Sequence, residues 1–160
     1  MINLELVLNS LSNAGVEFII IGGFAARQHG AARLTDDLDI FYGRSRENIR
    51  KLAAAIEPLH PYLRGAPPNL PFRFDEETIR RGLNFTLTTD AGPLDCLGEV
   101  SGIGNYNEAA ASAVTAEVFG VACKFLDLDS LITAKRAAGR PKDFEALAEL
   151  EIIREERERT

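Results

Sequence analysis

Two aspartates, Asp37 and Asp39, are separated by a single residue, Leu38, at the start of an apolar segment of the chain. The run Leu38 to Tyr42 predicts a β-strand, on which alternate side chains point to the same face. Both carboxylates should therefore project together, while Leu38 and Ile40 point into the core. Two like charges at this range repel each other unless a cation lies between them, and hard oxygen ligands favour Mg²⁺ or Mn²⁺ over zinc. Acidic residues near a strand end are more often simply solvated, so the pair alone does not identify a metal site.

A pair of glycines, Gly22 and Gly23, separates an apolar run from a short helical segment. The run Val16 to Ile21 is typical of a strand buried on both faces, and Phe24 to His29 contains good helix formers. Backbone N–H groups at such a strand-to-helix turn are free to hold a phosphate, and the missing Cβ atoms let a ligand approach closely. The turn is therefore a candidate phosphate-binding site.

The spacing of these two features resembles the signature of the DNA polymerase beta superfamily of nucleotidyltransferases. Ile21-Gly22-Gly23 is followed, after thirteen residues, by Asp37-Leu38-Asp39-Ile40. Such proteins carry a third acidic residue on a later strand, and Asp95 in the segment Pro93 to Leu97 matches it. The tail, residues 131–135 and 139–144, is similar to that of the small bacterial members called minimal nucleotidyltransferases, some of which belong to toxin and antitoxin systems.

The resemblance implies transfer of a nucleotide from a nucleoside triphosphate, such as ATP, to a hydroxyl group, with release of pyrophosphate. Asp37, Asp39 and Asp95 would ligate Mg²⁺ or Mn²⁺, and Asp95 would also help the acceptor hydroxyl to lose its proton. Gly22 and Gly23 would hold the triphosphate. Many members carry serine after the first glycine, whereas this chain has glycine there and would rely on backbone N–H groups.

Five further residues are candidate nucleotide-binding residues, and each has a structural alternative. Arg33 and Thr35 lie on the segment that leads to the metal strand, where they could contact phosphate oxygens or brace the segment. The resemblance places Lys135, Arg140 and Lys142, together with Asp143, near the cleft, although basic residues around a helix break also stabilise helix ends and keep the surface soluble.

The remaining periodicity predicts helices and strands in alternation. Helices are expected over 4–11, 45–57 and 129–138 and from Pro141 onward, and strands over 83–88, 94–100 and 117–125. The segment His60 to Pro71 holds most of the prolines, so we expect an irregular loop there. This order predicts an α/β (α+β) fold with a mixed sheet flanked by helices, which is the nucleotidyltransferase fold that the resemblance implies.

The composition is that of a globular protein and limits its partners. With 160 residues, 46% of them apolar and 26% charged, the chain fits one nucleotidyltransferase-like domain over 1–160. No apolar run approaches the roughly 20 residues needed to cross a bilayer, so we expect no membrane partner and a cytoplasmic location. A net charge of −6 disfavours non-specific binding to nucleic acid.

The expected acceptor follows from how few residues remain outside the predicted sheet and helices. Little chain remains beyond the sheet and its helices to build an enclosed acceptor pocket, so we expect a macromolecular acceptor, protein or RNA, presented from outside. The rival hypothesis is a non-catalytic binding module of a toxin and antitoxin pair, which would keep the fold and act through contact with a partner protein.

Overall fold

A seven-stranded mixed sheet forms the centre of the computed structural model, which describes residues 1–160, in the order β3-β4-β5-β2-β1-β7-β6. The strands are β1 (Phe18–Ile21), β2 (Leu38–Tyr42), β3 (Tyr62–Leu63), β4 (Asn84–Thr89), β5 (Gly92–Leu97), β6 (Val114–Val118) and β7 (Val121–Phe125). β1 and β2 pair antiparallel, whereas β2 pairs with β5, and β1 with β7, in parallel. The predicted mixed sheet is confirmed, and β5, β2 and β1 are its three middle strands.

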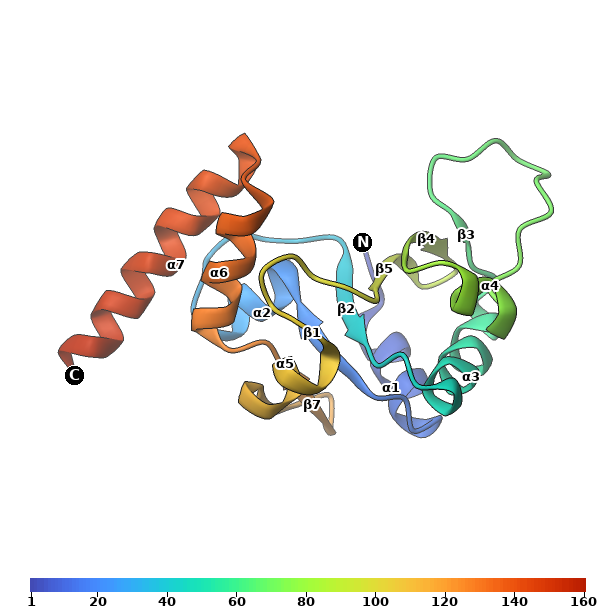
Figure 1. Cartoon of the computed structure of the whole chain (residues 1–160), viewed down its shortest axis with the longest axis horizontal. Coiled ribbons are helices and arrows are strands. Elements are labelled where there is room, and N and C mark those ends of the chain that lie inside the picture. The colour runs from blue at the N-terminus through green and yellow to red at the C-terminus, as the bar shows by residue number, and fades with distance from the viewer.

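Helices surround this sheet, with α3 and α4 near its β3–β4 side and α6 and α7 on the opposite side (Figure 1). They are α1 (Leu4–Asn13), α2 (Gly22–Gln28), α3 (Arg46–Ile56), α4 (Glu76–Arg81), α5 (Tyr106–Ser112), α6 (Leu128–Ala138) and α7 (Pro141–Arg159), with a 3₁₀ turn at Glu57–Leu59. Most begin at a polar cap, as at Ser45, whose Oγ accepts a hydrogen bond from the N–H of Asn48 at 3.1 Å. By contrast, no side chain caps α2.

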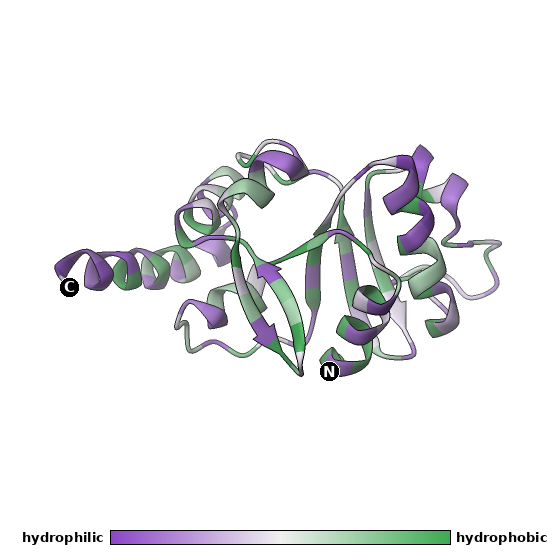
Figure 2. Cartoon of the chain, turned by 90° about the horizontal axis from the view of Figure 1, so that it is seen from below, coloured by the Kyte–Doolittle hydropathy of each residue, from purple (hydrophilic) through white to green (hydrophobic).

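Burial of the middle strands accounts for their continuous apolar sequence. All four residues of β1 are buried, and Ile19 and Ile20 are almost completely excluded from solvent, each contributing about 1.5–3 kcal/mol of transfer free energy. β4 instead alternates buried and exposed residues, because it lies nearer the sheet edge with one face open. Figure 2 shows apolar stretches on the strands of the sheet, interrupted by hydrophilic residues, and both kinds of residue on the helices.

Three expectations about the elements are corrected. The single strand expected over 117–125 is a hairpin of β6 and β7, because Phe119 and Gly120 both adopt positive φ and reverse the chain. The loop expected over His60 to Pro71 contains β3, which pairs with β4 at the edge of the sheet. The helix after the paired glycines begins at Gly22 itself rather than at Phe24, so the glycines are its first turn.

Helix α7 packs along α6 at the outside of the molecule (Figures 1 and 2). Near its far end the Arg157 guanidinium donates to Nδ1 and to the carbonyl oxygen of His29, each at 3.1 Å. The His29 ring therefore carries its proton on Nε2, which donates to the carbonyl oxygen of Leu126 at 2.8 Å. The contact between Arg157 and His29 ties the last helix to the end of α2. No helix of the fold combines the length and the apolar character that a bilayer crossing demands.

Candidate active site

The site is built on one row of residues that runs across the three middle strands. In the antiparallel pair of β1 and β2, Ile21 lies opposite Asp39, and in the parallel pair of β2 and β5, Asp39 lies opposite Asp95. Residues in register on neighbouring strands point to the same face of a sheet. The strand pairing therefore brings together two of the predicted catalytic carboxylates with the residue that precedes the glycine turn.

The glycine turn is in van der Waals contact with the Asp39 side chain. Gly22 adopts φ +65°, and a Cβ atom built on it would lie only 2.1 Å from Oδ2 of Asp39. A Cβ on Gly23 would lie 2.8 Å from Cβ of Thr35. Glycine is therefore required at both positions, at Gly22 for the backbone conformation as well as for the space. The glycine turn and the Asp39 carboxylate are therefore in direct contact in the fold.

The Asp39 carboxyl group lies in a strongly anionic, poorly solvated environment. Burial first, then the charge and hydrogen bonding of Asp95, and then the charge of Asp37, raise the pKa of Asp39 to about 7. The Lys135 charge opposes this shift. An ionised Asp39 is therefore costly here unless more positive charge approaches it, which is the electrostatic condition that a bound cation relieves.

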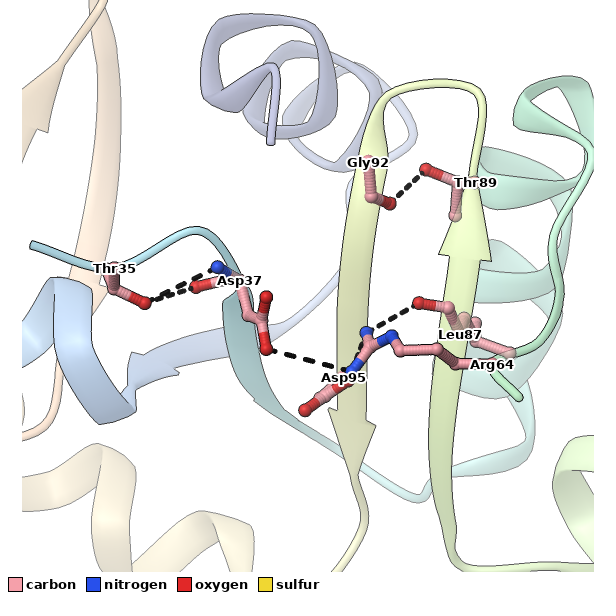
Figure 3. A network of polar contacts seen from close by, with 7 residues as sticks. All are labelled: Thr35, Asp37, Arg64, Leu87, Thr89, Gly92 and Asp95. Carbon is pink, nitrogen blue, oxygen red and sulfur yellow. Dashed lines mark hydrogen bonds and ion pairs between the residues drawn. The ribbon is translucent and has the colours of Figure 1, made fainter. Parts of the chain in front are cut away.

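Asp37 lies immediately before β2, and its side chain is 44% exposed. A guanidinium group joins it to Asp95: Arg64 Nη2 donates to Oδ1 of Asp95 at 2.7 Å, and Arg64 Nη1 lies 3.7 Å from Oδ2 of Asp37 (Figure 3). Arg64 follows β3, in the segment for which the sequence predicted only a loop. The sequence analysis did not identify Arg64 as a site residue, because no motif surrounds it in this proline-rich segment.

Thr35 braces the segment that leads to β2. Its hydroxyl group donates to the carbonyl oxygen of Asp37 at 3.2 Å, and the Asp37 N–H lies 3.4 Å from the same hydroxyl oxygen (Figure 3). Thr35 was expected either to contact phosphate oxygens or to brace the segment, and this contact braces the segment. It holds the backbone on which Asp37 is carried.

Five of the seven candidate nucleotide-binding residues line one cavity of about 140 Å³ between α2, the 31–35 segment, α6 and α7. They are Gly22, Gly23, Arg33, Thr35 and Lys135. Most of the remaining lining is aliphatic. The cavity is smaller than the roughly 300–1,000 Å³ of typical ligand pockets, so it has room for part of a nucleotide rather than for all of it.

The two other candidates, Arg140 and Lys142, do not line this cavity. Arg140 is held by Asp143, whose side chain is only 3% exposed: Arg140 Nε donates to Oδ2 at 2.7 Å. Lys135 Nζ donates to Oδ1 of the same carboxylate at 3.2 Å. Lys142 is exposed and forms no ion pair. Asp143 thus sets the position of two of the four predicted basic residues, Lys135 and Arg140.

Hydrogen bonds from Arg140, together with the charges of Arg140 and Lys135, lower the pKa of Asp143 to about 2. Its Oδ2 also lies 3.3 Å from the N–H of Arg140, which is the residue that caps α7. An acidic residue three positions after a helix start is a recognisable capping pattern. That pattern would have identified Asp143 as a structural residue, although not its contact with Lys135.

The three aspartates provide the oxygen ligands that a hard divalent cation prefers. Asp37, Asp39 and Asp95 offer carboxylate oxygens, and burial together with the neighbouring carboxylates raises the pKa of Asp39. The side chains as they stand do not yet converge: no group of three Asp, Glu, His or Cys residues is arranged to hold one ion. Asp37 and Asp95 contact Arg64 instead.

Comparison with known proteins found no matching family model and no matching curated protein. Solved structures do match. The crystal structure of ANT(2″)-Ia in complex with adenylyl-2″-tobramycin aligns with a TM-score of 0.55 and 18% identity, over 98% of this chain and 95% of that one. TM1012 from Thermotoga maritima, a candidate nucleotidyltransferase, aligns with a TM-score of 0.57 and 15% identity, over 92% and 93% of the two chains. The expected fold class is confirmed: this chain has the nucleotidyltransferase fold.

Proposed function

We propose that this protein transfers a nucleotide from a nucleoside triphosphate to a hydroxyl acceptor and releases pyrophosphate. The observation that carries the proposal is the row formed by the Gly22 turn, Asp39 and Asp95, because it places a close-approach backbone turn against two carboxylates. The structural neighbours support the same reaction class.

Each part of the site has a role in this reaction. Asp37, Asp39 and Asp95 would hold Mg²⁺ or Mn²⁺, which stabilises the attacking and leaving oxygens of an in-line displacement when bound. The cavity beside the glycine turn accepts the nucleoside, and Gly22 and Gly23 lie against the phosphates. Lys135 lines that cavity and its charge acts on Asp39, so its ammonium group can neutralise phosphate charge. Asp95, 21% exposed, is accessible to an acceptor hydroxyl and accepts its proton.

The acceptor we propose is a hydroxyl on a macromolecule, protein or RNA. The cavity beside the glycine turn includes neither Asp39 nor Asp95, so the acceptor side of the carboxylates lies outside it. ANT(2″)-Ia provides the contrasting case, because its structure contains an adenylylated small molecule and its chain aligns over 95% of its length. Chain length therefore does not exclude a small acceptor, and the experiment must include one.

Incubation with α-labelled nucleoside triphosphates, Mg²⁺ and either a cell lysate or hydroxyl-rich small molecules tests the reaction. We expect a labelled macromolecular band with the wild type and with Asp36→Asn, an exposed acidic neighbour that serves as the control, and no band with Asp39→Asn. Label on small molecules alone would overturn the acceptor proposal. No transfer to any acceptor, together with no pyrophosphate release, would overturn the reaction.

The second candidate function is a non-catalytic module of a toxin and antitoxin pair. The exposed apolar side chains of Phe144 and Ile152 on α7 would be available for contact with a partner protein. Pyrophosphate release measured with and without a co-purifying partner separates the two candidates. A partner-bound protein that never releases pyrophosphate would favour the module.

A further inference from the structure

Arg64 enters the site from the edge of the sheet. Its backbone N–H donates to the carbonyl oxygen of Thr86 at 3.0 Å, which continues the pairing of β3 with β4. From there its side chain crosses β4 and reaches Asp95 on β5 (Figure 3). Arg64 is thus the point at which an edge segment of the fold touches the catalytic carboxylates.

In the guanidinium group, Nη2 forms two hydrogen bonds, whereas Nε forms none. Nη2 donates to the carbonyl oxygen of Leu87 at 2.6 Å and to Oδ1 of Asp95 at 2.7 Å. Nε is buried and has no hydrogen-bond partner. A buried N–H without a partner costs free energy, so this position of the side chain is not optimal by its own hydrogen bonds. Its ion pairs with Asp95 and Asp37 are what favour it.

Arg64 is the cationic side chain that pairs with Asp37 and Asp95. Lys135 Nζ is held by Asp143 on the α6–α7 side, whereas the ion pairs of Asp37 and Asp95 are made with Arg64 alone. A divalent cation ligated by Asp37 and Asp95 would therefore face the guanidinium across the same oxygens. Two positive groups cannot share those oxygens without strong repulsion.

We propose that Arg64 competes with the divalent cation for Asp37 and Asp95: its guanidinium neutralises these carboxylates in the metal-free protein and must withdraw for the metal to bind. This inference rests on the proposed function, since it presumes that the carboxylates bind metal. The fold gives the side chain freedom to withdraw, because it is 30% exposed and because residues 64–75, which follow the two-residue β3, form no helix or strand (Figure 1).

Calorimetric titration of Mn²⁺ into the nucleotide-free protein tests the competition without any catalytic turnover. Arg64→Gln should bind Mn²⁺ roughly tenfold more tightly than the wild type, because a competing positive charge is removed. Arg81→Gln removes an equally basic residue that pairs with Glu77 on the surface of α4, and it should bind like the wild type. Unchanged or weaker binding by Arg64→Gln would overturn the inference while leaving the proposed function intact.

A second measurement uses the wild-type fold, so that it does not depend on the stability of Arg64→Gln. The Nε–H resonance of Arg64, assigned by its loss in Arg64→Lys, should be protected from solvent exchange without metal because Nε is buried. Addition of Mg²⁺ should shift the resonance and remove that protection. A resonance unmoved by saturating Mg²⁺ would show that the guanidinium stays in place. Absence of any metal binding by the wild type would overturn both this inference and the proposed function.

Discussion

Asp39 on β2 and Asp95 on β5 lie directly opposite each other in a parallel strand pair, with the backbone of Gly22 against the first of them. Burial raises the pKa of Asp39 most, and repulsion from the neighbouring carboxylates of Asp95 and Asp37 adds to the rise. A cation beside these carboxylates would therefore stabilise their ionised form.

Nucleoside triphosphate binding should require a divalent cation. Calorimetry in Mg²⁺ should show binding that disappears in EDTA, and the double substitution of Asp37→Ala with Asp39→Ala should abolish the metal-dependent part, because the bridge between protein and phosphate is lost. Asp36→Asn serves as the control for loss of one acidic charge. Equal affinity with and without EDTA would contradict the metal bridge.

Asp95→Asn should separate binding from turnover. A residue that accepts the proton of the acceptor hydroxyl affects the chemical step more than the triphosphate, so nucleotide affinity should stay within a few fold while transfer falls by roughly a hundredfold or more. Single-turnover kinetics and calorimetry on the same preparation measure both quantities. Wild-type transfer in this variant would make Asp95 a structural residue only.

Gly22→Ala should abolish metal and nucleotide binding, because the new Cβ would lie 2.1 Å from Oδ2 of Asp39. Gly120→Ala is the matched control: its φ of +74° is similarly strained, but nothing lies within 4 Å of the added Cβ. Both variants should lose about 1–2 kcal/mol of stability from the left-handed backbone, and Gly22→Ala should lose more. Equal stability losses with intact Mn²⁺ binding in both variants would contradict the steric role of Gly22.

Asp39→Asn should stabilise the metal-free protein in a pH-dependent way. Because the folded-state pKa of Asp39 is raised to about 7 from an ordinary value of 3.8, the wild type loses stability from this group as the pH rises between those values. The asparagine variant does not titrate there. In EDTA its advantage should be small at pH 4 and reach roughly 1–3 kcal/mol at pH 8. Denaturant unfolding at both pH values measures it, and an advantage that shrinks with rising pH would contradict the assignment.

Asp143→Asn should weaken nucleotide binding through two residues that it positions. With the charge removed, Lys135 and Arg140 lose their shared partner, so KM for the triphosphate should rise roughly tenfold with a smaller change in kcat, and stability should fall by about 1–3 kcal/mol. Glu151→Gln, which removes a carboxylate of α7 paired with Arg136 at the surface, is the control.

The sign of the acid dependence follows from the lowered pKa of Asp143. Its stabilisation is complete above the ordinary pKa of 3.8 and is lost as the pH falls towards 2. The stability difference between wild type and Asp143→Asn should therefore shrink over that window. A difference that is constant down to pH 2 would mean that the carboxylate is not ionised by its partners.

The strand that carries Asp39 and the turn at Gly22 were predictable because they depend on local periodicity, whereas the row that adds Asp95 depends on the pairing of β2 with β5. The two-residue period of a strand places Asp37 and Asp39 on one face, and a glycine pair between strand and helix marks a turn, whatever the rest of the fold. The reach of Arg64 to Asp95 was not predictable, since it depends on the pairing of β3 with β4 at the far edge of the sheet. The β6–β7 turn was missed because Phe119, a residue that seldom adopts positive φ, occupies a left-handed position.

The parallel pairing of β2 with β5 also constrains when the site can form. Asp39 and Asp95 are 56 residues apart in the chain, and a parallel pair requires the whole intervening segment to be folded around before the two strands can meet. Such long-range contacts make folding slow relative to local hairpins and helices. On the ribosome, the glycine turn and Asp39 emerge well before Asp95, and Lys135 and Asp143 later still. A nascent chain therefore carries separate parts of the site for much of its synthesis, and Asp39 meets Asp95 only once β5 has paired with β2.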